Sequence, residues 1–460
     1  MRPRTTRRRF LSAAASGAAA LTILRNPQSA RGYQANEKLG VALVGVAGRG
    51  SWFVQTIPKM ENVTALCDVN QQRAAEAFAQ LPDVPKFADF RVMLDKAGRQ
   101  IDAVICATTD HTHAVISMAA IKAGKGVFCE KPLAHDVGEN RALRLAARQY
   151  NVATQMGNQG TASEAFRRGV ELVQGGVIGE VREVHVYNSG GGTGPKPPPS
   201  EAMPVPAWLD WDLWLGPNPM RPFHPDWMNR HSWREFGTSQ LGNWATHSAN
   251  LPFKALQIDS LWHAGAAEAA KIRLEAEVSS IERVNFPKWA AVRYDVPARG
   301  DLPPVKLTWH QGTGSPGFQD LIARIVKHGL TEDPRQKGPE KFTHHAGCLL
   351  VGSEGMLYAI AHNTSITLLP QEKFKDLQGP PRTLPRSRGH EREWFDACRG
   401  GPPAMSNFDY SGPLTEFLML GNIATQFDRP IEFDPMAGRI TNSPEADRLV
   451  LREYREGWTL

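Results

Sequence analysis

Short apolar runs alternate with polar segments of helical length over the first third of the chain. The runs are LGVALV (39–44), VTALC (63–67), DAVICA (102–107) and GVFC (126–129). Buried parallel strands have continuous apolar sequences, and helices between them give a repeating strand–helix order. We therefore predict a doubly wound parallel sheet of an α/β fold over residues 37–157.

Beyond residue 157 the pattern changes to runs in which apolar and polar positions alternate. The candidate strands are EVREVHVYNSG (180–190), AKIRLEAEVSS (270–280), WAAVRYDV (289–296), VKLTWHQG (305–312) and CLLVGSEGMLYAI (348–360). This alternation is typical of an antiparallel sheet with one covered face. We predict a second, α+β domain over residues 158–460 with an open, mostly antiparallel sheet. Two amphipathic helices around a Pro/Gly loop should close it between residues 389 and 426.

Length and composition agree with two soluble globular domains. The chain has 460 residues, 41% hydrophobic and 22% charged. A single core seldom serves a chain of this length. We see no internal repeat and no coiled-coil heptads.

The first thirty residues differ from the rest of the chain. TRRRFLSAAASGAAALTIL has a basic head and an apolar, Ala-rich stretch that is too short for a comfortable membrane span. The Arg7–Arg8 pair matches the twin-arginine export pattern. We predict an export signal over residues 1–30, with cleavage after Ala30 and a periplasmic or other extracytoplasmic destination. The alternative is a disordered basic arm.

Charge outside this segment gives no reason to expect nucleic acid as a partner. The six arginines of residues 1–30 equal the formal net charge of +6, so the rest of the chain is close to neutral. No membrane span is expected after removal of the signal. The five cysteines are widely spaced and odd in number, which argues against a disulfide framework.

A glycine-rich turn follows the first apolar run. In GVAGRG, Gly45, Ala47 and Gly50 occupy the G-x-G-x-x-G positions, and Gly48 and Arg49 lie between them. Glycines let the backbone approach a pyrophosphate, and the N-terminus of the next helix offers unpaired N–H groups to it. Asp68 ends the second run about 20 residues later, where an acid accepts hydrogen bonds from ribose hydroxyls and repels a 2′-phosphate. We predict a Rossmann domain that binds NAD, with NADP less favoured.

Four motifs in this order, GVAGRG, Asp68, TTDHTH (108–113) and CEKP (129–132), resemble the glucose–fructose oxidoreductase, inositol dehydrogenase and MocA family. The resemblance covers nearly the whole chain after about residue 36. It implies that Lys131 lies beside the nicotinamide and faces a substrate hydroxyl, with Pro132 shaping the turn. Thr109 stands where many members of the family have proline.

The resemblance also implies further cofactor contacts. Together with the glycine turn and Asp68, the implied contact positions are Thr108, His113, Glu130, Lys131, Pro132, Asn158 and Gln159. His111 is an additional histidine to which the resemblance gives no role.

A second catalytic stretch, FGTSQLGNWATHSANLPFKAL (236–256), departs from the family pattern. The family has an Asp, then a His four residues later, and often an Asp three further on; here these are Asn243, His247 and Asn250. The spacing predicts one helical face. The resemblance implies that His247 is the general base. We expect Asn243 to orient its ring without adding charge, so that Lys131 carries more of the proton transfer.

Two further site hypotheses concern aromatic and histidine-rich segments. Trp208, Trp211 and Trp214 lie in a long Gly/Pro loop and are either core residues or sugar platforms. Trp214 and Asn250 are the candidate substrate contacts. No compact spacing of His and Asp residues supports a metal site.

The predicted function is an exported NAD-dependent oxidoreductase that acts on a sugar, glycoside or cyclitol hydroxyl. Because free NAD is scarce outside the cytoplasm, we expect a tightly held cofactor that is reoxidised in the same site. One alternative is a glycosidase or lyase that oxidises, eliminates and reduces again with retained NAD. Another is a non-catalytic sugar-binding protein on a Rossmann scaffold. We expect a homo-oligomer, a dimer or tetramer.

Overall fold

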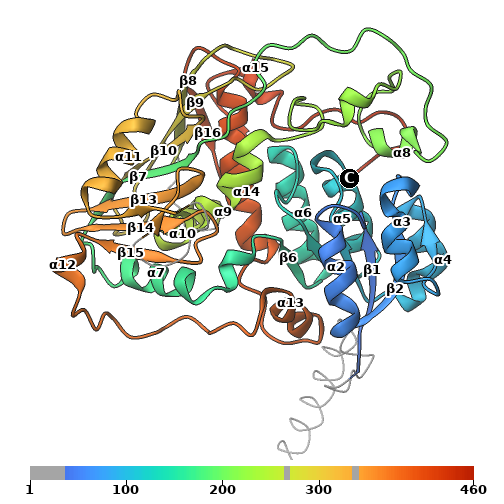
Figure 1. Ribbon diagram of the computed structural model, residues 1–460, viewed down its shortest axis with the longest axis horizontal. Coiled ribbons are helices and arrows are strands. Elements are labelled where there is room, and N and C mark those ends of the chain that lie inside the picture. Colours follow the sequence, from blue (N-terminus) through green and yellow to red (C-terminus); the bar gives the residue numbers. More distant parts are fainter. Residues whose placement is uncertain (1–36, 264–269, 334–340) are drawn as a thin grey trace, which may run out of the picture.

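A computed structural model describes residues 37–263, 270–333 and 341–460 (Figure 1). The predicted export signal lies outside the described residues. Among the residues described, no helix is both long and apolar enough to span a bilayer.

The first domain is a six-stranded, fully parallel sheet with helices on both sides. The strand order is β3(Lys86–Phe87), β2(Asn62–Cys67), β1(Gly40–Val44), β4(Ala103–Cys106), β5(Gly126–Cys129) and β6(Thr154–Met156). Its helices are α2(Gly50–Thr56), α3(Gln71–Gln80), α4(Phe90–Ala97), α5(His113–Lys122) and α6(Val137–Tyr150). Short polar caps begin several of them; the Asn70 side chain, for example, accepts a hydrogen bond from the Arg73 N–H at the start of α3. The predicted parallel sheet is confirmed.

The second domain is built on a nine-stranded sheet with one parallel pair, β7 with β10. Its order is β15(Ile366–Leu369), β14(Met356–Ile360), β13(Ala346–Gly352), β7(Val181–Asn188), β10(Val305–Gln311), β9(Ala290–Val296), β8(Ile272–Val278), β16(Ile431–Asp434) and β17(Arg439–Ile440). The other pairs are antiparallel. The predicted mostly antiparallel sheet is therefore confirmed, and CLLVGSEGMLYAI forms the hairpin β13–β14.

Helices cover this second sheet and connect it to the first domain. The α-helices after the first domain are α7(Glu164–Gln174), α8(Trp211–Leu215), α9(Thr246–Ser248), α10(Asn250–Ala255), α11(Phe318–Lys327), α12(Gln371–Phe374), α13(His390–Cys398), α14(Phe408–Ala424) and α15(Pro444–Asp447). A π-helical turn, η7(Leu241–Ala245), precedes α9. A small separate sheet pairs β11(Thr331–Glu332) with β12(Lys341–Phe342).

Short 3-10 turns complete the order. They are η2(Ile57–Lys59), η3(Gly98–Gln100), η4(Asp110–Thr112), η5(Gln159–Ala162), η6(Pro225–Met228) and η8(Ile258–Trp262).

The helix α14 corrects one expectation. We predicted an amphipathic helix, but nearly every residue of α14 is buried. The reason is its position between the two domains, where it packs against α6 on one side and against β8 on another (Figure 1). A helix that is covered all round is apolar all round.

Chain segments from the second half return to the first domain. Trp394 of α13 packs its ring on Phe128 of β5, with centroids 5.6 Å apart. The long excursion between β7 and η7 carries α8, and Leu209 just before α8 forms a β-bridge with Asn70. The chain after α15 also returns to the first domain (Figure 1). Segments that are distant in sequence therefore cover the first sheet where its strands end.

Candidate active site

A cavity of about 300 Å³ lies at the carboxyl ends of β1, β2 and β4. Gly45 and Gly48 have φ of +78° and +57°, which side chains rarely adopt. A Cβ on Gly50 would lie 1.9 Å from the Gly45 carbonyl oxygen. No side chain of these glycines therefore covers the backbone where a pyrophosphate would approach the N-terminus of α2.

Asp68 forms the next wall of this cavity. Its carboxylate accepts hydrogen bonds from the N–H groups of Val46 and Asn70, at 3.0 and 2.9 Å. Burial raises the pKa of Asp68 above its usual value, although those hydrogen bonds oppose the effect. The carboxylate is fixed where a ribose diol would bind, so the residues present fit a dinucleotide.

Of the predicted cofactor positions, Gly45, Ala47, Gly48, Arg49, Asp68 and Thr108 line the cavity together with Trp214. Gly50 is not among the lining residues; it packs against the Gly45 carbonyl oxygen of the turn. His113 lies elsewhere: its ring is buried, and its two nitrogens lie 2.7 and 3.2 Å from the carbonyl oxygens of Pro132 and Thr108. It joins the two loops at the ends of β4 and β5.

Asn158 and Gln159 follow β6 at the start of η5. Asn158 is fully buried, and its Oδ1 accepts a hydrogen bond from the Ser406 hydroxyl. Its Nδ2 is buried with no hydrogen-bond partner in the described part of the chain. Such an unsatisfied donor is costly unless a ligand or water completes it. Gln159 is half-buried.

Lys131 follows β5, two residues after the last residue of the strand, Cys129. It precedes a cis peptide bond to Pro132. Its neighbour Glu130 accepts a hydrogen bond from Arg49 Nε at 2.7 Å, which joins the lysine loop to the glycine turn. The Lys131 ammonium donates to the Asn243 side-chain oxygen at 2.6 Å and to the Asn243 carbonyl oxygen at 3.2 Å. Burial lowers the pKa of Lys131, so its neutral amine forms more readily.

The contact of Asn243 differs from our expectation. We expected its oxygen to orient His247, but it binds Lys131 instead. The cause is local: Asn243 lies in the π-helical turn η7, whereas His247 lies in α9. The wider π turn changes the angle between successive side chains, so α-helical spacing does not apply.

His247 is buried beside Lys131, and in the described part of the chain no side-chain hydrogen bond orients its ring. Its Nδ1 has no partner among the described residues. Its ring packs on His362, with centroids 4.4 Å apart. Burial, and next the positive charge of Lys131, keep the pKa of His247 well below its usual value. The imidazole is therefore neutral at neutral pH and can accept a proton.

Asn250 does not reach this site. Its amide donates to Thr161 Oγ1 at 2.9 Å, and its oxygen accepts from the Tyr410 hydroxyl at 2.7 Å. It is 1% exposed. The structure thus places Asn250 as a core link between η5, α10 and α14.

The tryptophans divide between core and cavity. Trp211 and Trp214 stack at 4.8 Å within an aromatic cluster that also contains Phe236. Trp214 additionally lines the nucleotide cavity. His111 fixes this cluster to the first domain, because its Nε2 lies 2.7 Å from the Trp214 carbonyl oxygen.

Three residues near Lys131 were not identified from the sequence. Trp244, His345 and His362 surround the same position: the Trp244 ring lies 4.3 Å from His345 and 5.4 Å from His362. Burial, and next Lys131, lower the pKa of His362 to about 4. Trp244 lies three residues before His247 in the chain, whereas tertiary folding alone brings His345 and His362 to this position, so no motif marks the two histidines.

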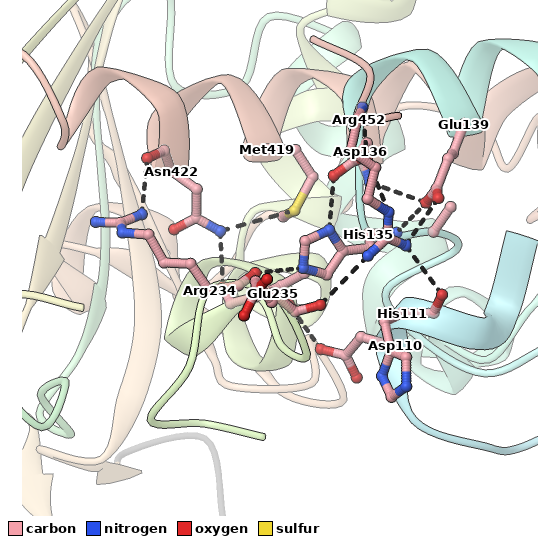
Figure 2. Close-up of polar contacts among 12 residues, drawn as sticks. Asp110, His111, His135, Asp136, Glu139, Arg234, Glu235, Met419, Asn422 and Arg452 are labelled. Atoms are coloured by element: carbon pink, nitrogen blue, oxygen red, sulfur yellow. Dashed lines mark hydrogen bonds and ion pairs between the residues drawn. The ribbon is translucent and has the colours of Figure 1, made fainter. Parts of the chain in front are cut away.

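A charged network behind the lysine loop holds it in place (Figure 2). His135 Nδ1 lies 2.6 Å from Asp136, and its Nε2 lies 2.6 Å from the Arg234 carbonyl oxygen. Asp136 and Glu139 form the capping box that begins α6. Arg452, from the last segment of the chain, contacts both acids and the His111 carbonyl oxygen.

The structure also gathers one group that offers metal-type ligands. Ligand atoms of Cys106, His113 and Cys129 lie within 4.8 Å of one another. Both nitrogens of His113 already face carbonyl oxygens. All five cysteines are free and buried. We assign no metal to this group.

Comparison with known proteins agrees with this geometry. Residues 39–158 match the Gfo/Idh/MocA family, described as an oxidoreductase family with an NAD-binding Rossmann fold. This part of the chain is thus similar to the NAD-binding domain of that family.

Curated relatives match over part of their length. Levoglucosan dehydrogenase from Pseudarthrobacter phenanthrenivorans is 29% identical over 28% of this chain and 33% of its own length. Inositol 2-dehydrogenase from Pseudomonas fluorescens is 32% identical over 32% of this chain and 44% of its own. This chain therefore spans less than half the length of these relatives.

Solved structures match over nearly the whole described fold. A levoglucosan dehydrogenase in complex with NADH and L-sorbose has a TM-score of 0.55 at 17% identity, covering 87% of this chain and 100% of that one. The aldose–aldose oxidoreductase from Caulobacter crescentus, complexed with glycerol, has a TM-score of 0.53 at 14% identity, covering 86% and 100%. At these identities the likeness shows the two-domain fold.

Proposed function

We propose that this protein is an NAD-dependent oxidoreductase that acts on a hydroxyl group of a sugar, glycoside or cyclitol. The observation that carries the proposal is Lys131, a partly buried amine at the end of β5 that is linked through Glu130 and Arg49 to the nucleotide cavity. The named activities of the similar dehydrogenases support the substrate class.

The residues divide the work of alcohol oxidation between them. NAD, when bound along the glycine turn and Asp68, supplies the acceptor for a hydride from the hydroxyl-bearing carbon. Lys131, as a neutral amine, takes the hydroxyl proton while the C–O bond becomes a carbonyl. Asn243 holds the Lys131 Nζ at 2.6 Å and stabilises the resulting ammonium without a formal charge. In the reverse direction the same ammonium returns the proton.

The proposal is tested by mixing the NAD-loaded protein with a panel of aldoses, methyl glycosides and inositols and recording nicotinamide absorbance. We expect absorbance of reduced nicotinamide with at least one member of the panel. A substrate deuterated at the oxidised carbon should transfer its label to the nicotinamide. Absence of reduction with every panel member and every related sugar acid would contradict the proposal.

A second candidate function is the cleavage of a glycoside through transient oxidation. Two neutral imidazoles, His247 and His362, lie in contact beside Lys131, whereas a simple dehydrogenation needs one proton acceptor. After oxidation by hydride transfer, an imidazole can remove the proton next to the new carbonyl, and the Lys131 ammonium formed in the oxidation can protonate the departing oxygen. Water then adds, and the stored hydride returns.

The two candidates differ in their net products. An aryl glycoside incubated in D₂O should give free sugar with deuterium beside the oxidised carbon and no net NADH if the second candidate is right. A plain dehydrogenase gives intact oxidised glycoside and stoichiometric NADH.

We also propose that the cofactor is held tightly, because export would remove the chain from cytoplasmic NAD. The basis for export is the Arg7–Arg8 motif in the segment outside the described residues. Replacing both arginines by lysine in the native host should leave the protein in the cytoplasm. Export of that variant at the normal level would contradict the proposed export by the twin-arginine route.

We also propose that the protein forms a homo-oligomer. Sedimentation of the purified protein would test this proposal.

A further inference from the structure

The last twelve residues of the chain lie against the nucleotide domain, far in sequence from the glycine turn. Trp458 lines the nucleotide cavity and is 8% exposed. Its ring lies 6.2 Å from Phe90, the first residue of α4 and another lining residue. It thus contributes an aromatic wall that no glycine or acidic motif of the sequence marks.

The sheet order shows which part of the cavity this wall encloses. The strands run β3, β2, β1, β4, so β1 and its turn lie centrally, and β3 lies at the outer edge. Asp68 follows β2, and its carboxylate lies where the adenosine ribose would bind. Phe90 and Trp458 lie beyond it on the β3 side, which is the adenine end of the cavity.

The tail is held at several points along its length. Arg452 is half-buried and forms ion pairs with Asp136 and Glu139, as Figure 2 shows. Three residues later, Arg455 donates from Nε to the Gly216 carbonyl oxygen at 2.7 Å and from Nη1 to Asp212 at 2.6 Å. The guanidinium of Arg91 then lies 4.7 Å from the Trp458 ring centroid. Trp458 is therefore fixed rather than free.

The excursion that carries α8 is attached to the segment between β2 and α3. The Gln71 N–H donates to the Trp208 carbonyl oxygen at 2.8 Å, and the Asp210 N–H donates to the Val69 carbonyl oxygen at 2.9 Å. Arg455 joins this excursion to the tail through Asp212. The cavity is thus bordered by two segments that lie outside the Rossmann fold and that are hydrogen-bonded to each other.

We infer that Trp458 is an adenine-binding residue and that Arg455, by tying the tail to α8, keeps this residue over the bound dinucleotide and slows its release. The inference rests on the proposed function, because it takes NAD as the ligand. An adenine ring is a flat, apolar π-system, and the indole of Trp458 offers it a face or edge in a desolvated position. Release then requires the latch between Arg455 and Asp212 to open.

The test measures the dissociation of NADH rather than turnover. Protein loaded with NADH is mixed with excess NAD, and the loss of bound-NADH fluorescence gives the release rate. We expect Trp458→Ala and Arg455→Ala to release NADH about fivefold faster, since a lost contact of about 1 kcal/mol corresponds to about fivefold when 1.4 kcal/mol is tenfold. Asp212→Asn, which leaves Arg455 in place, should also speed release.

Arg182→Ala is the matched control. It removes an exposed ion pair with Glu180 on β7, outside the cavity, and should release NADH at the wild-type rate. Trp458→Phe should fall between the wild type and Trp458→Ala. Unchanged release in both Trp458→Ala and Asp212→Asn, with normal thermal unfolding, would overturn the inference. If the wild-type protein binds no NADH, the proposed function itself fails, which is a different outcome.

Discussion

At the scale of single residues, the central feature is an amine paired with an amide. Lys131 has the Asn243 oxygen at 2.6 Å, and burial lowers its pKa. A carboxylate at this position would stabilise the ammonium, whereas the amide stabilises it less. The chain therefore has a lysine that deprotonates more readily and can serve as the base.

Replacing Asn243 by Asp should move the pH–rate profile. The new charge raises the pKa of Lys131, so a smaller fraction is neutral at a given pH. The acidic limb of kcat/KM should move to higher pH, and turnover at neutral pH should fall. Asn62→Asp, at an exposed position at the start of β2, is the control. A limb that stays in place for Asn243→Asp would show that this pair does not govern proton transfer.

Removing the amine itself should abolish turnover without unfolding the protein. Lys131→Met keeps the chain length of the side chain and should lower kcat by about 10²–10⁴, the usual contribution of a general base. NADH binding and thermal unfolding should stay near those of the wild type. The exposed Lys375→Met serves for comparison. Wild-type turnover in Lys131→Met would contradict the role of Lys131 as the base.

The sequence predicted which residues meet at this site better than it predicted their contacts. The family-like motifs singled out Lys131 and His247, and the structure brings the two close enough for the Lys131 charge to act on the imidazole. The partner of Asn243 was not predicted, since it depends on a π turn that spacing cannot reveal. His362 was missed, because it follows β14, more than a hundred residues from His247.

At the scale of elements, the turn between β1 and α2 depends on two glycines for different reasons. Gly45 needs a positive φ, and Gly50 needs space for the Gly45 carbonyl oxygen. Gly50→Ala should force these backbones apart, with a stability loss of about 1–3 kcal/mol and weaker NADH binding.

Gly98→Ala is a matched control for that variant, because a Cβ at this position meets no atom within 4 Å. It should keep the wild-type unfolding midpoint and NADH affinity. Denaturant titration and fluorescence titration measure both quantities. Equal behaviour of Gly50→Ala and Gly98→Ala would contradict the role of the turn.

Hydrophobic patterns were sufficient to predict most strands of the two sheets, but not every element. Continuous apolar runs predicted the parallel strands, and alternation predicted the strands of the second sheet. The two-residue strand β3 carries too little pattern to be recognised. The burial of α14 was also missed, because a pattern describes one helix and not the second layer that covers its other face.

At the scale of the whole molecule, buried ion pairs link segments that are distant in sequence. Glu171 of α7 receives hydrogen bonds from Arg386 and from the N–H groups of Thr383 and Leu384. Burial alone would raise the pKa of Glu171, but these donors outweigh it and lower the pKa to about 2. They fasten the segment that leads from the second sheet back to α13.

This contact predicts a loss of stability in acid. Because the folded pKa of Glu171 lies below the usual 4.5, its contribution is present above pH 4.5 and is lost as the pH falls toward 2. Glu171→Gln should lower the unfolding temperature at neutral pH and flatten its dependence on pH within this window. Parallel unfolding curves for the variant and the wild type would contradict the assignment.

The sequence did not reveal the contacts that distant segments of the chain make with the nucleotide domain. The tail with Arg452 and Trp458 returns to the nucleotide domain through contacts that no local pattern encodes. The excursion that carries α8 also contacts the nucleotide domain through residues distant in sequence. The sequence indicated a Rossmann domain, but part of the cavity wall, including Trp214 and Trp458, comes from outside that domain.

The most direct test of the central claim, a resident dinucleotide that serves Lys131, is to denature the purified folded protein and identify the released nucleotide by mass and redox state. The account predicts NAD or NADH in near-stoichiometric amount, and conversion of one into the other when substrate is added first. A folded protein that releases no nucleotide, even after equilibration with excess NAD, would contradict it.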